Sequence, residues 1–216
     1  MKTVERGRVY TSKSKQDGIN SWFHALDYTD VALNLFMAGW FLRLWIAPHV
    51  DDANDIYSLS VLLAFEILML HSGTFMALFP PKWSILVFIP AYGLFAWAYS
   101  HALEDNFVMW VYLIVVLNRM RFAFFNKNIG LRMRTVKSSF ICAFIYIGVL
   151  GIVYAVRSKL PVFGLTTAFL EEARPKDPLL FGNTVFVVAF GAAYYICLAI
   201  FNLWVSRNPE KLEKDM

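Results

Sequence analysis

Six long apolar stretches, separated by short polar segments, follow one another between Val31 and Trp204. Each is close to the roughly 20 helical residues that cross the ~30 Å hydrocarbon core of a bilayer. Apolar residues run continuously instead of alternating with polar ones, so strands are not predicted. The pattern predicts an all-α, polytopic transmembrane bundle of six spans with short loops: Thr29–Ala47, Ile56–Phe79, Trp83–Ser100, Asn106–Phe124, Ser139–Val156 and Asn183–Trp204.

The same pattern divides the chain into a cytoplasmic N-terminal tail (1–28), one transmembrane domain (29–204) and a C-terminal tail (205–216). Within the first tail, 18–28 mixes aromatic and polar residues, which is typical of a short helix lying in the inner membrane interface. The external stretch 161–172 is apolar but too short to cross the bilayer. We expect it to form an amphipathic or re-entrant segment on the outer face.

Composition agrees with a membrane protein. Hydrophobic residues make up 58% of the 216 positions and charged residues 17%, whereas soluble domains usually have about 45–50% and about 25%. Cys142 and Cys197 each lie alone in an apolar stretch. They are therefore interpreted as small hydrophobic residues and not as a disulfide or a thiolate metal site.

The distribution of basic residues orients the predicted bundle. With both termini in the cytoplasm, 15 of the 20 Lys and Arg residues lie on the inner side. Four lie outside (Arg157, Lys159, Arg174 and Lys176), and Arg43 lies within the first span. Because cytoplasmic loops carry the excess of Lys and Arg, we expect a multi-pass protein of the bacterial inner membrane with both termini inside.

Glu66 lies near the middle of the second span, about 15 Å below its outer end at 1.5 Å per residue. A carboxyl group at this depth has to be protonated or paired with a base. Arg43, near the outer end of the preceding antiparallel span, is the predicted partner. Two interpretations stay open: a structural link between the first two spans, or a proton or cation carrier.

His71 lies five residues beyond Glu66, about 140° further around the helix, so these two side chains do not share one face. Asn34, Asn118 and Asn202 fall at a similar depth in other spans. Such residues could form interhelical hydrogen bonds or line a cavity open to the cytoplasm. No haem is expected, because His71 has no second histidine at a matching depth within the spans.

Two outer loops carry histidine beside carboxylates: His49, Asp51 and Asp52 in one, and His101, Glu104 and Asp105 in the other. Imidazole and carboxylate ligands suit Zn²⁺ or Mn²⁺, so the loops could form a metal site if they meet. A solvated acidic rim without metal explains the same residues.

The inner connection after the fourth span is strongly basic, and it is a candidate docking surface for anionic lipid or a cytosolic protein. Its bases are Arg119, Arg121, Lys127, Arg132, Arg134 and Lys137. No nucleic-acid-binding module accompanies them, so a nucleic-acid partner is not expected.

Three function classes remain open. The first is a non-enzymatic membrane component, serving as an anchor, sensor or scaffold subunit of a homo- or hetero-oligomeric assembly. The second is a small proton- or ion-coupled channel or transporter centred on Glu66. The third is a metal-dependent or lipid-modifying membrane enzyme that uses the outer His/Asp cluster. The first is preferred, because catalytic motifs of the common enzyme classes are missing from the sequence.

Overall fold

The computed structural model describes residues 28–78, 81–102, 110, 113–114, 129–174 and 183–208. Within these ranges all regular structure is helical, which confirms the all-α prediction. Residues 28–46 form the first helix. It is followed by η1 (Val50–Asp52), α2 (Ala53–Leu78), α3 (Pro81–Ala102), α5 (Ile129–Ala155), η2 (Arg157–Lys159), α6 (Thr167–Ala173) and α7 (Thr184–Arg207).

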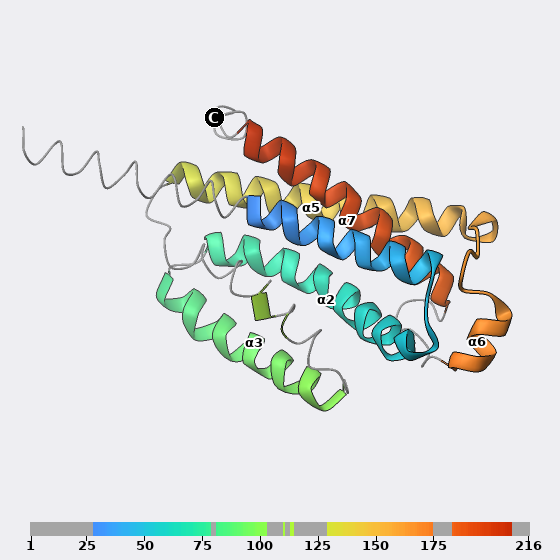
Figure 1. Cartoon of the computed structure of the whole chain (residues 1–216). Helices are drawn as coiled ribbons and strands as arrows, with labels where there is room; N and C mark the ends of the chain where they lie inside the picture. Colours follow the sequence, from blue (N-terminus) through green and yellow to red (C-terminus); the bar gives the residue numbers. More distant parts are fainter. Residues whose placement is uncertain are drawn as a thin grey trace, which may run out of the picture.

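The long helices lie side by side along one common direction (Figure 1). α2 packs mainly against α5, and α5 packs against α7. The first helix ends, and α2 and α7 begin, at the end of the bundle that carries the short helix α6 (Figure 1). We call this the α6 end. Neighbouring helices therefore alternate in direction, as in an up-and-down bundle.

Helix positions agree closely with four of the predicted apolar stretches, but α5 differs. It begins at Ile129 and not at the predicted Ser139, so Arg132, Arg134 and Lys137 are helical and do not belong to a loop. The segment from Leu131 to Ser138 contains neither Pro nor Gly, and straight-chain bases favour the helix almost as well as leucine does. The prediction was wrong here because it placed the start of the helix where the apolar residues begin.

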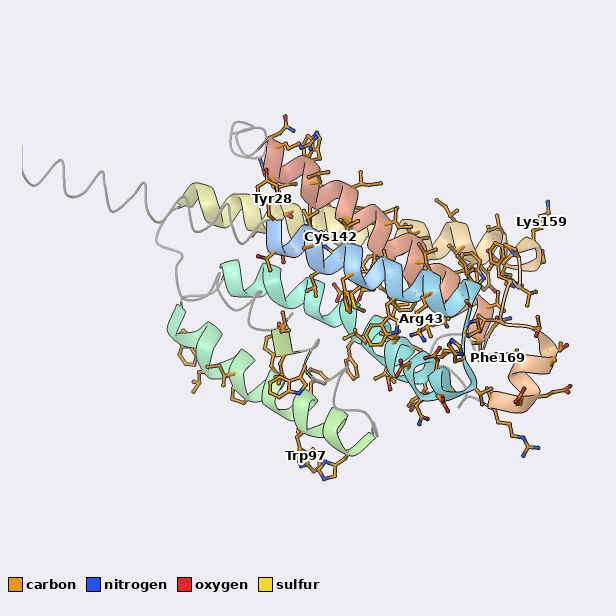
Figure 2. The ribbon with its side chains drawn as sticks, viewed as in Figure 1. Tyr28, Arg43, Trp97, Cys142, Lys159 and Phe169 are labelled. Carbon is orange, nitrogen blue, oxygen red and sulfur yellow. The ribbon has the colours of Figure 1, made fainter. Side chains whose placement is uncertain are left out.

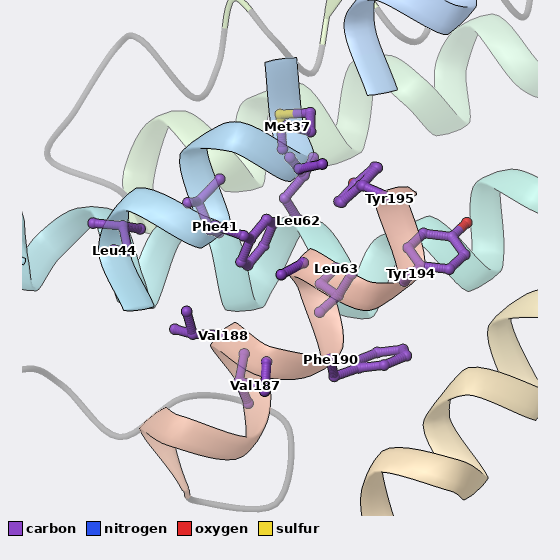
Figure 3. Packing of buried hydrophobic residues seen from close by; sticks show 14 of the residues in the cluster. Met37, Phe41, Leu44, Leu62, Leu63, Val187, Val188, Phe190, Tyr194 and Tyr195 are labelled. Atoms are coloured by element: carbon purple, nitrogen blue, oxygen red, sulfur yellow. The ribbon is translucent and has the colours of Figure 1, made fainter. Parts of the chain in front are cut away.

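The core lies where the first helix, α2, α5 and α7 meet. Figure 3 shows Met37, Phe41 and Leu44 of the first helix gathered in one cluster with Leu62 and Leu63 of α2 and with residues of α7. Phe41 stacks on Tyr195 of α7, with ring centroids 5.7 Å apart.

Gly191 explains how closely the first helix approaches α7. A Cβ atom added at this position would lie 2.4 Å from the nearest ring carbon of Phe41. Only a residue without a side chain fits there, because Phe41 is itself fully buried in the core. The glycine therefore determines the spacing of the two helices.

Two of the described helices are long and apolar enough to cross a membrane: Val136–Ala155 within α5, with a mean hydropathy of 2.0, and α7, with 2.2. Their surroundings differ. Much of α7 is enclosed by the other helices, whereas α5 leaves Phe144 73% exposed and Ile152 65% exposed. An apolar helix with so much exposed surface is unlike the core helix of a soluble protein.

Candidate functional site

The buried carboxyl group of Glu66 lies at the meeting point of three helices. Its residue is 3% exposed, on the face of α2 that also buries Leu62 and Leu63. Tyr194 of α7 donates a hydrogen bond from its hydroxyl to Oε1 of Glu66, over 3.3 Å, and both residues are buried. The acid predicted to be buried is therefore hydrogen-bonded across a helix interface.

Tyr146 brings the third helix, α5, to the same place. Its hydroxyl donates to the backbone carbonyl of Leu63, 3.0 Å away on α2. Its ring meets those of Tyr194 and Phe190 edge-on, with centroids 5.1 Å away in both cases. Buried polar groups require partners, and each tyrosine supplies one while its ring fills apolar space. We call Glu66, Tyr146 and Tyr194 the polar core.

Arg43 does not pair with Glu66 as predicted. Its Nη2 instead lies 3.0 Å from both carboxylate oxygens of Asp52, in the turn between the first helix and α2. The prediction was wrong because it matched the residues by depth and charge alone. Asp52 is nine residues away in sequence, and η1 turns its carboxylate back toward the end of the first helix.

Asp52 organises this turn as well as neutralising Arg43. Its Oδ2 accepts a hydrogen bond from the backbone N–H of His49, at 2.8 Å. The Asp52 side chain is 11% exposed, whereas that of Arg43 is 49% exposed. The carboxylate is thus turned inward, and part of the guanidinium faces outward.

The loop after α5 packs on the same end of the first helix. The indole Nε1 of Trp45 donates to the carbonyl of Pro161 at 2.9 Å, and the N–H of Gly164 donates to the carbonyl of Trp45 at 3.1 Å. Phe163 places its ring edge-on to Trp45, with centroids 5.2 Å apart, from a backbone with φ of 44°. We call residues 160–166 the docked loop.

The docked loop and α6 form a cover over the α6 end. Leu165 is fully buried, and α6 packs against η1. The side chain of Thr166 caps α6 by accepting from the N–H of Phe169, at 3.3 Å. The predicted amphipathic segment 161–172 therefore contains a short helix, preceded by a loop held through Trp45.

The predicted metal site finds no support in the described part of the chain, where no group of three or more His, Cys, Asp or Glu side chains comes together. The ring of His101 instead packs against that of Trp97, with centroids 4.7 Å apart. Trp97 lies well away from Arg43 and its partner Asp52 (Figure 2). Glu104 and Asp105 lie outside the described residues.

The inner polar residues are described in part. Asn34 and Asn202 are half-buried on the first helix and α7, and the backbone carbonyl of Asn202 accepts from the hydroxyl of Ser206 at 2.8 Å. Asn118 and the His71 side chain lie outside the described part, so the predicted cluster stays a prediction.

The basic docking surface is likewise described only in part. Lys137 is half-buried on α5. The side chains of Arg132 and Arg134 are not described, although their backbone is helical. Arg119, Arg121 and Lys127, together with the predicted interfacial helix before Tyr28, lie outside the described residues. A docking role for this surface remains a prediction.

Sequence reasoning missed Tyr146, Tyr194 and Trp45. A usable signal was present for the tyrosines, since a hydroxyl in an apolar helix has to find a partner. No comparable signal pointed from Trp45 to a loop more than a hundred residues later. A search for similar proteins among family models, curated proteins and solved structures finds no match.

Proposed function

We propose that the chain is a multi-pass integral membrane protein that acts as a non-enzymatic component of an oligomeric membrane assembly. The observation that carries the membrane assignment is the amount of large apolar surface on the outside of several helices. Such residues are Leu35, Phe36, Trp83, Leu86, Leu94, Trp97, Phe140, Phe144, Ile152 and Ile200, each at least half exposed. In water a surface of this kind drives aggregation, whereas lipid chains cover it without penalty.

The arrangement of the helices supports the proposed six spans. The first helix, α2 and α3 alternate in direction, and α3 ends toward the α6 end (Figure 1). α5 begins at the opposite end. A fourth span at 106–124 would connect these ends and complete the alternation. The distribution of basic residues then assigns the α6 end to the outer side.

Glycines on the outward face of α5 support the assembly. Gly148 and Gly151 are exposed, and a Cβ atom at either would meet none of the described residues within 4 Å. They follow the exposed Phe144 on the same face, opposite the buried Tyr146. Membrane helices associate where small residues let their backbones approach closely. Among the described residues, close contacts are made by Gly164 and Gly191 and not by these two glycines, which are thus available to another helix.

The polar core favours a structural role for Glu66, since Tyr194 joins it to a second helix. The same burial is the observation that keeps proton coupling as a second candidate function, because intramembrane carboxyl groups often carry protons. The two differ in what Glu66→Gln changes. If Glu66 has a structural role, the substitution lowers the stability of the protein. If Glu66 carries protons, the substitution abolishes proton uptake driven by a pH gradient in proteoliposomes while the fold is retained.

The mass of the particle tests the proposed assembly. In nanodiscs, we expect a protein mass above the 24.8 kDa of one chain, or a co-purifying protein. Gly148→Leu fills the open face of α5 and should lower the assembled fraction. Gly93→Leu is the matched control, because Gly93 is exposed on α3 and a Cβ atom there would likewise meet none of the described residues within 4 Å. A strictly monomeric particle without co-purifying protein contradicts the assembly and favours the transporter.

A further inference from the structure

The outward face of the first helix carries a shallow groove lined by Leu35, Phe36, Gly39, Trp40 and Arg43. Gly39 lies in the middle of this lining in sequence, and a Cβ atom there would meet none of the described residues within 4 Å. Phe36 and Trp40 stand beside it as an edge-to-face pair with ring centroids 5.8 Å apart. The lining is thus apolar along its length, with a cation at one end.

The cationic end of the groove is the Arg43 guanidinium, which Asp52 holds in place and which has further N–H donors. Arg43 uses Nη2 for Asp52, and among the described residues its Nη1 and Nε have no partner. The Asp52 carboxylate is buried, also accepts from the backbone N–H of His49, and is not among the residues that line the groove. The exposed edge of Arg43 therefore presents N–H groups, which suit a phosphate oxygen.

We propose that this groove binds one phospholipid, with an acyl chain along Gly39 and the phosphate on Arg43. From Leu35 to Arg43 the helix rises about 12 Å, close to the thickness of one leaflet of a bilayer core of ~30 Å. Arg43 stands one turn before the end of its helix, at the α6 end, where headgroups begin. The match of apolar length and terminal charge selects a phospholipid over an uncharged chain. The inference rests on the membrane location proposed above.

Native mass spectrometry of the full chain tests this, using phosphatidylglycerol and diacylglycerol with the same acyl chains. We expect one retained phosphatidylglycerol per chain, bound about tenfold more tightly than diacylglycerol. Gly39→Leu should lower this binding by a similar factor because its side chain fills the groove. Gly93→Leu, which opens onto no groove residue, should bind as the wild type does.

Three results would overturn the proposal: equal binding of the two lipids, equal binding by Gly39→Leu and Gly93→Leu, or a Gly39→Leu defect confined to self-association. The last would assign the groove to a second copy of the chain. Alkaline carbonate extraction of cell membranes shows whether the lipid site alone is wrong or the membrane location as well. If the wild type is extracted, the membrane location is wrong; if it stays and Gly39→Leu binds lipid normally, the lipid site alone is wrong.

Discussion

The Tyr194 hydroxyl gives Glu66 a hydrogen-bond donor from a helix that is far away in sequence. A tyrosine suits this position, because its ring packs in apolar surroundings while its hydroxyl satisfies a polar group. The Tyr146 ring packs edge-on against that of Tyr194 and holds it in place. The Tyr194 hydroxyl therefore satisfies part of the hydrogen-bonding capacity of the buried Glu66 carboxyl group.

Removing the Tyr194 hydroxyl should destabilise the protein. We expect Tyr194→Phe to lower the free energy of unfolding by about 1 kcal/mol, the net value of a typical hydrogen bond. Because Glu66→Gln weakens the same contact, the double variant should lose less than the two single losses added together. Thermal unfolding in detergent measures this, with Tyr28→Phe, at a half-exposed tyrosine, as the control. Strictly additive losses would mean that the two side chains do not interact.

At the residue scale, the sequence indicated that Glu66 is buried but not which residue it contacts. Depth can be counted along an apolar stretch, since each helical residue rises by a constant amount. Partner choice depends on the rotation of each helix and on how the turns fold. We predicted that Arg43 pairs with Glu66, yet the η1 turn places the Asp52 carboxylate next to the Arg43 guanidinium. No feature of the first two spans alone reveals that competition.

Among the elements, the docked loop joins parts of the chain that the apolar pattern leaves separate. Gly164 lies so close to the end of the first helix that an added Cβ would be 2.3 Å from Cδ of Pro48 and 2.6 Å from the carbonyl oxygen of Ile46. The N–H of Gly164 also donates to Trp45. A side chain at this position cannot be accommodated without moving backbone, so the loop has to shift.

Gly164→Ala should therefore release the docked loop. Trypsin cleaves after Arg157 and Lys159, which are exposed at the start of this region. Because cleavage tracks the population of opened molecules, a loss of about 1.4 kcal/mol in docking should speed it about tenfold. Gly93→Ala is the control, since its Cβ meets no neighbour. Equal cleavage rates for the two variants would show that Gly164 does not hold the loop.

At the element scale, apolar length predicted most helix positions because an unbroken apolar segment of about 20 residues satisfies its backbone polar groups within itself only as a helix. It failed at the start of α5, where charged residues extend the helix beyond the apolar part. It also left open whether 161–172 enters the bilayer. The structure shows only that this segment contains α6 and a loop held by Trp45 and Gly164, through contacts that depend on tertiary structure and carry no periodic signal.

For the molecule as a whole, the outward surface is the feature on which the membrane proposal rests. α7 is largely enclosed, whereas α3 and α5 turn Trp83, Leu94 and Phe144 outward. The exposed ionisable side chains at the α6 end include Asp51, Glu171 and Lys159. Apolar flanks with charged ends are the distribution that a bilayer imposes, since lipid chains contact the middle of each helix and water contacts its ends. Membrane orientation is therefore the property to test first.

Cysteine labelling can test the orientation at positions that the structure shows to be exposed. In a background without Cys142 and Cys197, we expect cysteines at Asp51, Ser158 and Glu171 to react with an impermeant maleimide in spheroplasts. A cysteine at Arg207, at the opposite end of α7, should react only after permeabilisation. The reason is that 15 of 20 bases lie inside in this orientation. If only the cysteine at Arg207 is labelled in intact spheroplasts, the orientation is the opposite of the one proposed. If all four sites are labelled there, α7 does not span the membrane.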